Sequence, residues 1–162
     1  GDEDEGSIEL LIKEIMINNR KTLSVAESCT GGKISSIFTF NKGASRFFKG
    51  GIIAYSNESK SSVLNISDTL IKKEGSVSSN VAEAMALGVK KHFKSDYGIA
   101  TTGNAGPTAG DKNSEIGIVY IAISGPNDVI SYRYQMGNNR ERVINKTTNK
   151  ALELFFRLIK SD

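Results

Sequence analysis

Histidine and cysteine are the scarcest reactive residues here: the 162 residues include one of each, His92 and Cys29. One histidine cannot build a histidine-rich zinc or copper site, and one cysteine cannot close an intrachain disulfide or supply a CxxC pair. We therefore expect no metal and no other cofactor. A Ser-His-Asp triad would have to recruit His92 from the apolar stripe of a helix, where a packing or surface role is more common.

Long apolar stretches are absent as well. No window approaches the roughly 20 consecutive apolar residues that a membrane-spanning helix needs. The first residues are acidic, whereas a signal peptide begins with basic ones. We expect a cytoplasmic protein without a membrane partner, and the length fits a single domain that buries roughly 70% of its unfolded surface.

The charge of the chain is divided unevenly. Its net charge is +3, but residues 2–5 are all acidic, and without them 21 basic residues stand against 14 acidic ones. A body of that sign favours an anionic partner, either a nucleic acid or a small phosphorylated substrate. The lysines could equally serve solubility alone. No run of five cations or aromatic-interleaved basic stretch is present, which makes nucleic acid the weaker expectation.

The pattern along the chain alternates helices with strands. Residues 1–6 form an acidic linker remnant, and residues 7–162 form one domain. Apolar spacing predicts helices over 8–16, 34–38, 78–93 and 139–159, a short helix after the cap Ser56, strands over 22–26, 47–55 and 97–102, and a hairpin of 116–124 with 129–136. This order predicts an α/β fold, a three-layer α/β/α sandwich around a mixed, mostly parallel sheet.

A polar cluster follows each of the three predicted strands that lie outside the hairpin. They are residues 27–32, 55–60 and 101–110. Ligands of open α/β sheets bind outside the carboxyl ends of the strands, so we expect the clusters to meet at one edge. The first, Ser-Cys-Thr-Gly-Gly, offers hydroxyls and backbone N–H groups at the start of a helix, which suits a phosphate or an oxyanion, although an ordinary N-cap would look similar.

The second and third clusters suggest hydroxyl and lysine chemistry. Lys60 is either a surface lysine or one that burial pushes toward the neutral form, which makes it a possible general base. Cys29 is an alternative nucleophile, although a free cysteine is usually a small buried apolar residue. The glycine-rich loop with Thr101, Thr102 and Asn104 could wrap a sugar or an amide, or be a plain surface loop.

Seven ordered motifs cover nearly the whole chain after Gly6. They are AESCTGG (26–32), GAS (43–45), FFKGGIIAYSNESK (47–60), GSVS (75–78), the VAEAMALG helix, TTGNAGP (101–107) and NRER (139–142). In this combination the chain resembles the CinA C-terminal domain family. The resemblance implies an α/β/α sandwich that hydrolyses the amide of nicotinamide mononucleotide to nicotinate mononucleotide and ammonia, a step of pyridine nucleotide salvage.

The same resemblance implies roles for individual residues. Ser28 would be the nucleophile or the hydroxyl that faces the carbonyl, and Lys60 the base, with Tyr55 beside them. Arg142 would lie near the phosphate, and could reach it across a subunit boundary of a homo-oligomer. The remaining substrate-binding residues would be Glu27, Thr30, Gly31, Gly32, Ser45, Asn57, Thr102, Gly103, Asn104 and Gly106.

The chain departs from the family pattern on the substrate loop. Asn104 stands where an apolar residue is usual, Thr108-Ala109 where glycines are usual, and residues 114–117 where a Lys-Pro-Val-Gly-like run is usual. Glu115 could thus weaken phosphate binding. These changes keep a second interpretation open, a catalytically silent nucleotide-binding or assembly domain. The acidic start resembles the junction of longer family members, whose front half resembles a molybdopterin-binding domain.

Overall fold

The computed structural model describes residues 7–108 and 114–161, so the acidic stretch 1–6 expected as a linker lies outside the described residues. The elements in chain order are α1 (Ile8–Asn18), β1 (Leu23–Glu27), α2 (Lys33–Phe40), the short 3-10 helix η2 (Ala44–Arg46), β2 (Phe48–Ile53), α3 (Asn57–Leu64), α4 (Asp68–Glu74), α5 (Ser79–Phe93), β3 (Tyr97–Gly103), β4 (Ile118–Ser124), β5 (Val129–Gln135) and α6 (Arg140–Lys160). Within this part of the chain, no helix has both the length and the apolar character that crossing a membrane requires.

The strands form one mixed sheet in the order β2-β1-β3-β4-β5. β1 pairs in parallel with β2 and β3, whereas β4 pairs antiparallel with both β3 and β5. β1, β2, β3 and β5 therefore point the same way. The chain leaves β1 toward β2 and later returns on the other side of β1 to form β3, which makes the β1–β3 boundary a topological switch point.

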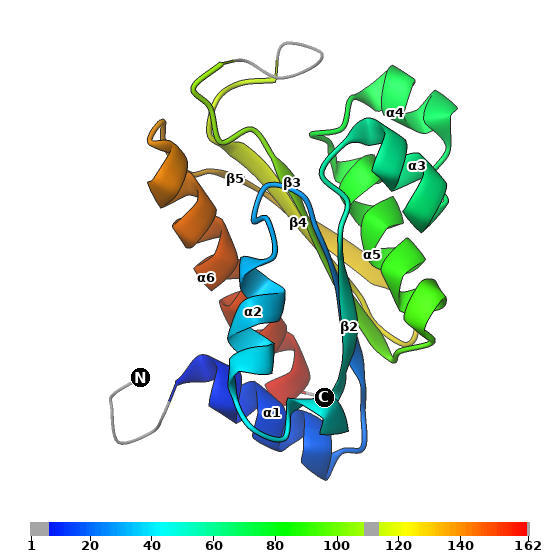
Figure 1. Ribbon diagram of the computed structural model, residues 1–162, viewed down its shortest axis with the longest axis vertical. Helices are drawn as coiled ribbons and strands as arrows, with labels where there is room; N and C mark the ends of the chain where they lie inside the picture. The colour runs from blue at the N-terminus through cyan, green and yellow to red at the C-terminus, as the bar shows by residue number, and fades with distance from the viewer. Residues whose placement is uncertain (1–6, 109–113, 162) are drawn as a thin grey trace.

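Helices cover both faces of the sheet, and the expected α/β/α sandwich is confirmed. Figure 1 shows α1, α2 and α6 on one side of the sheet and α3, α4 and α5 on the other. On the α6 side the strands present large residues such as Leu23, Val25 and Ile99. On the α5 side they present small ones, and a Cβ added to Gly98 would lie 2.4 Å from the Ala86 carbonyl oxygen. Small side chains thus let α5 pack close to the sheet.

The elements expected from the sequence are present, with small shifts of their ends. Ser56 caps α3 in a capping box with Ser59, and Ser78 caps α5. β2 has a register shift opposite Leu23 and Ser24, where Phe48 and Gly50 are their partners. The antiparallel β4–β5 pairing confirms the hairpin.

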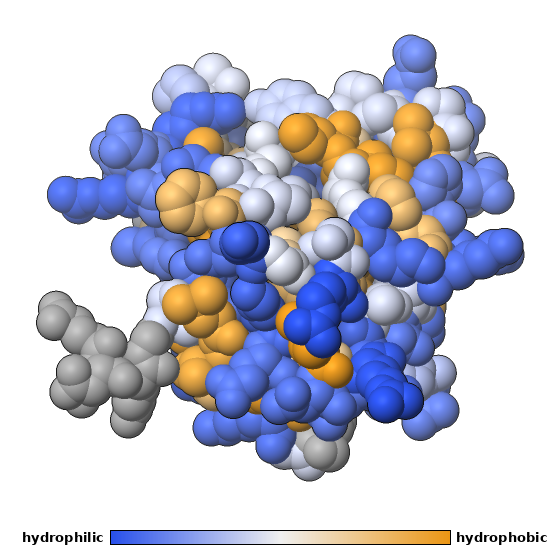
Figure 2. Space-filling model, turned by 60° about the horizontal axis from the view of Figure 1, so that its bottom comes forward, coloured by the Kyte–Doolittle hydropathy of each residue, from blue (hydrophilic) through white to orange (hydrophobic). Residues whose placement is uncertain are grey.

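Exposed apolar side chains are distributed over several elements. The large ones among the described residues are Leu10, Phe40, Ile53, Tyr55, Val63, Leu87 and Ile130. Figure 2 shows the apolar residues of one face as separate patches between hydrophilic ones. Such scattered residues are ordinary on globular proteins and do not by themselves mark a binding surface.

One buried carboxylate organises the turn between β1 and α2. Glu27 is fully buried, and its Oε1 accepts hydrogen bonds from Thr30 Oγ1 at 2.7 Å, Gly32 N at 3.1 Å and Ile34 N at 3.0 Å. Its Oε2 accepts from the backbone N of Ser35 at 2.8 Å and from its hydroxyl at 2.7 Å. Glu27 therefore supplies the negative charge that the amino-terminal end of α2 favours.

Replacing Glu27 by glutamine should destabilise the protein. All five partners are donors, so a glutamine amide in either orientation places its NH2 against N–H or O–H groups. Because a buried hydrogen bond to a charged group contributes about 1.5–3 kcal/mol, we expect Glu27→Gln to lower the free energy of unfolding by about 3 kcal/mol in urea titrations. The exposed Glu14→Gln in α1 is the control, with a change below about 0.5 kcal/mol. Equal unfolding midpoints for the two variants would contradict this role.

Candidate active site

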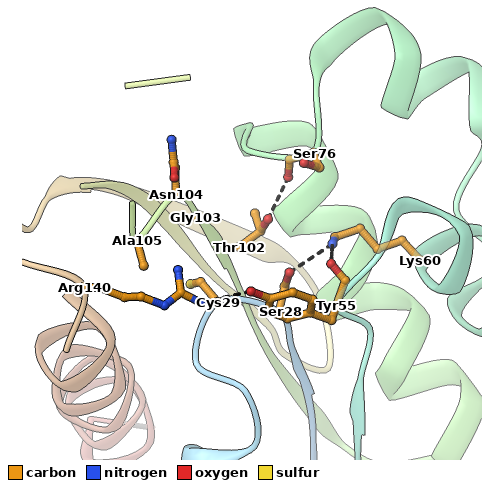
Figure 3. Close-up of a pocket in the computed structure, with 10 residues that line it drawn as sticks. All are labelled: Ser28, Cys29, Tyr55, Lys60, Ser76, Thr102, Gly103, Asn104, Ala105 and Arg140. Atoms are coloured by element: carbon orange, nitrogen blue, oxygen red, sulfur yellow. Dashed lines mark hydrogen bonds between the residues drawn. The ribbon is translucent and has the colours of Figure 1, made fainter. Parts of the chain in front are cut away.

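A small pocket lies at the carboxyl ends of β1, β2 and β3, where the topological switch point predicts a ligand site. Its volume is about 180 Å³, and it is lined by Ser28, Cys29, Tyr55, Lys60, Ser76, Thr102, Gly103, Asn104, Ala105 and Arg140. Figure 3 shows Lys60 reaching in from the side of α3, Arg140 from the side of α6, and Ser28 between them. The expected convergence of the three polar clusters is therefore observed.

Ser28 and Lys60 form the centre of the pocket. Lys60 Nζ donates to Ser28 Oγ at 3.0 Å, and it also donates to the carbonyl oxygens of Ala54 at 3.0 Å and Tyr55 at 3.4 Å. The lysine is 1% exposed and Ser28 is 6% exposed. Lys60 lies on the capped helix α3 and points its side chain into the pocket. β1 and β2 pair in parallel, so their carboxyl ends lie side by side, and Ser28 after β1 comes close to the residues that follow β2. Lys60 is thus a buried lysine whose amine contacts the Ser28 hydroxyl, and not a surface lysine.

Arg140 closes one side of the pocket. Its guanidinium donates to the Gly106 carbonyl oxygen at 2.6 Å and to the Tyr55 hydroxyl at 3.0 Å. These contacts connect the first residue of α6 with the loop after β3 and the loop after β2. Among residues 7–108 and 114–161 these contacts use two of the five N–H groups of the guanidinium, so others can meet a ligand.

The loop after β3 is held by its own side chains. Thr102 Oγ1 donates to the Ser76 carbonyl oxygen at 2.7 Å, which leaves its lone pairs as acceptors facing the pocket. Asn104 accepts from Gly106 N at 3.0 Å and donates to the Ser114 carbonyl oxygen at 2.9 Å. The amide of Asn104 therefore braces the loop on both sides.

Cys29 lines the pocket but is poorly suited to be a nucleophile. Burial raises the pKa of its thiol from 9.0 to about 12, because a thiolate loses its hydration there, while the hydrogen bond with Thr101 and the charge of Lys60 offset only part of this effect. At neutral pH the thiol stays protonated. The alternative nucleophile considered from the sequence is thus disfavoured.

Six of the residues expected in the site line the pocket: Ser28, Tyr55, Lys60, Thr102, Gly103 and Asn104. Arg140, Ser76 and Ala105 also line the pocket, although the sequence did not indicate them as site residues. Arg140 belongs to the quoted NRER motif, but which of its two arginines faces the pocket depends on where α6 begins. That start follows from the cap Asn139, whose side chain accepts from Arg142 N at 2.9 Å.

The first cluster, residues 27–32, is organised around its own carboxylate. The carboxylate of Glu27 fills the amino-terminal end of α2, so Glu27 and Thr30 contact each other and not the pocket. The N–H of Gly31 donates to the Ser28 carbonyl oxygen, and that of Gly32 to Glu27. These four residues build the turn that holds Ser28. The expectation that they bind substrate stays a prediction, since the hydrogen bonds described above for these residues lie within the turn.

Other expected residues also lie elsewhere. Ser45 is in η2, before β2 begins, and thus at the sheet edge opposite the pocket. Asn57 is an exposed residue in the first turn of α3, and Arg142 is exposed on α6; neither lines the pocket. Gly106 contributes its carbonyl to Arg140, while its N–H is used by Asn104.

Two further groups considered from the sequence lie outside the pocket. Glu115 is exposed and accepts from Gln135 Nε2 at 2.7 Å, and its expected effect on phosphate binding stays a prediction. His92 is exposed near the end of α5, where its ring packs against Phe93. Among residues 7–108 and 114–161, no three His, Cys, Asp or Glu side chains group as metal ligands.

Known proteins share both the sequence and the fold. A CinA-like protein of Flavobacterium psychrophilum is 46% identical over 159 residues, which cover 98% of this chain and 38% of that protein. A CinA-like protein of Prochlorococcus marinus subsp. pastoris is 43% identical over 150 residues, which cover 93% of this chain and 33% of that protein. The chain thus spans about a third of the length of these relatives.

Solved structures with this fold come from several bacteria. The competence/damage inducible protein CihA of Agrobacterium tumefaciens matches with a TM-score of 0.88 and 29% identity over 93% of each chain. A CinA superfamily protein of Escherichia coli matches with a TM-score of 0.90 and 27% identity, over 98% of this chain and 94% of that one. The family model of the CinA C-terminal domain matches residues 5–159, and the chain therefore belongs to the CinA C-terminal domain family.

Proposed function

We propose that the domain hydrolyses the amide of nicotinamide mononucleotide, releasing ammonia and nicotinate mononucleotide. The observation that carries this proposal is the buried pair of Lys60 Nζ and Ser28 Oγ, 3.0 Å apart in a pocket at the switch point of the sheet. A hydroxyl needs an adjacent base to attack an amide, and Lys60 is placed to act as one. The family resemblance supplies the substrate.

In the first step, Ser28 Oγ attacks the amide carbon while its proton passes to Lys60 Nζ. The carbonyls of Ala54 and Tyr55 can accept the two N–H bonds of a neutral amine, which turns the nitrogen lone pair toward Ser28. Desolvation favours that neutral form. The C–N bond then breaks, the nitrogen takes the proton from Lys60, and ammonia leaves.

In the second step, water attacks the ester formed on Ser28. Lys60 accepts a proton from the water and returns it to Ser28 Oγ as the carbon–oxygen bond breaks, which regenerates the hydroxyl. In a variant of this route, Ser28 orients the water for direct attack on the amide and no ester forms. Thr102 Oγ1 can accept a hydrogen bond from the substrate NH2 in either route.

Removing either member of the pair should abolish most turnover. General base catalysis contributes about 10²–10⁴-fold, so we expect Ser28→Ala and Lys60→Met to lower kcat for ammonia release by at least about a hundredfold. Methionine keeps the length of the buried stem. Ser62→Ala, an exposed site on the same helix, is the matched control.

Two results would contradict the proposal. One is ammonia release by Lys60→Met at the rate of the parent protein. The other is saturable binding of the mononucleotide by the parent protein without any turnover, which would instead support a silent nucleotide-binding domain. Circular dichroism of each variant separates lost chemistry from lost folding.

Cys29 should resist alkylation in the folded protein. At pH 8.5 a thiol with a pKa of about 12 is thiolate in roughly one molecule in three thousand, whereas a thiol at 9.0 is thiolate in roughly one in four. We expect iodoacetamide to label the native protein about a thousandfold more slowly than the urea-unfolded chain, as measured by mass spectrometry. Because Cys29 is the one cysteine, the readout is unambiguous. Equal rates would show that the thiol is accessible and ionised.

A further inference from the structure

The phosphate of the proposed substrate cannot use the amino-terminal end of α2. That position, the usual anion site of a strand–turn–helix unit, is occupied by the Glu27 carboxylate and its five hydrogen bonds. A second anion beside a buried carboxylate would be repelled. The phosphate therefore needs cations from other segments.

We propose that the groove between α2 and α6 binds the sugar phosphate of the substrate, with Lys33 and Arg140 as the two cations that hold the phosphate. This groove is a cavity of about 340 Å³ lined by Lys33, Arg140, Glu141, Ile144 and Asn145. Arg140 also lines the catalytic pocket, so the two cavities share a wall. The inference rests on the proposed function for the identity of the ligand, and it adds the place of its charged end.

The size of the catalytic pocket indicates that the amide-bearing ring and the sugar phosphate of the substrate bind in different cavities. Pockets that enclose a drug-sized molecule measure about 300–1,000 Å³, whereas the catalytic pocket measures about 180 Å³. It can take the amide-bearing ring, but the ribose and phosphate must extend beyond it. Arg140 forms one side of the catalytic pocket (Figure 3) and also lines the groove, so a ligand that extends past Arg140 enters the groove.

The chemistry of the groove suits a phosphorylated sugar. Lys33 is an exposed cation in the first turn of α2, and Arg140 retains donors beyond those used by Gly106 and Tyr55. Asn145 offers an amide to sugar hydroxyls, and Ile144 an apolar surface. Glu141 is the one acidic residue among those lining the cavity, so the local charge is +1.

Binding measurements test the groove without requiring turnover. We would titrate the parent protein and its variants by calorimetry with nicotinate mononucleotide, the proposed product, and with its riboside, which lacks the phosphate. Lys33→Ala should weaken mononucleotide binding about tenfold and leave riboside binding unchanged. Glu141→Gln should tighten mononucleotide binding severalfold, because it removes the opposing charge.

The matched control is Lys73→Ala, which removes an exposed lysine from α4 on the other side of the sheet and should change neither affinity. Both charge effects should diminish as salt rises, since the residues are exposed. Arg140 is left unchanged because it also holds Tyr55 and the loop at Gly106.

The outcomes separate this inference from the proposed function. If Lys33→Ala weakens mononucleotide binding but the parent protein releases no ammonia, the groove is supported as the phosphate site and the amidase proposal is contradicted. If ammonia is released but Lys33→Ala and Lys73→Ala bind the mononucleotide alike, the groove assignment is overturned and the amidase proposal stands. Equal affinity of the parent protein for mononucleotide and riboside would also overturn the groove.

Discussion

The whole site depends on the carboxylate of Glu27. Five donors from residues 30–35 converge on it, and this sets both the start of α2 and the tight turn that carries Ser28. Because the carboxylate is buried and its partners are backbone and hydroxyl groups of one short segment, the turn has little freedom to relax. Ser28 is therefore presented at the end of β1 by a rigid support, as a reacting hydroxyl requires.

The same carboxylate determines which positive groups remain available to an anionic ligand. The amino-terminal end of α2, which would ordinarily attract a ligand anion, is neutralised by Glu27, so an anionic ligand would have to be met by side-chain cations. Lys60 is buried against Ser28 and the carbonyl oxygens, whereas Arg140 and Lys33 lie exposed at the pocket edge and in the adjoining groove. The structure thus separates a buried amine suited to proton transfer from exposed cations suited to binding.

The loop after β3 shows how a buried polar side chain can support its own segment. Both ends of the Asn104 amide are satisfied within the loop, by Gly106 N and by the Ser114 carbonyl. A buried amide whose hydrogen bonds are made costs little free energy, so Asn104 braces the loop. The acidic Glu115 contacts Gln135 outside the pocket.

The sequence by itself determined the order of helices and strands, the caps Ser56 and Ser78, and the family, because these depend on local periodicity and on motifs that are contiguous in the chain. It also indicated Ser28, Lys60 and Thr102, since Ser28 directly follows a strand, Thr102 lies near the end of one, and Lys60 lies in the first turns of a capped helix. Only the tertiary structure decided that Glu27 faces α2, that Arg140 and not Arg142 faces the pocket, and that Ser45 lies at the far edge. These outcomes depend on side-chain direction and on contacts between segments up to 85 residues apart, such as Arg140 with Tyr55, which no local pattern encodes.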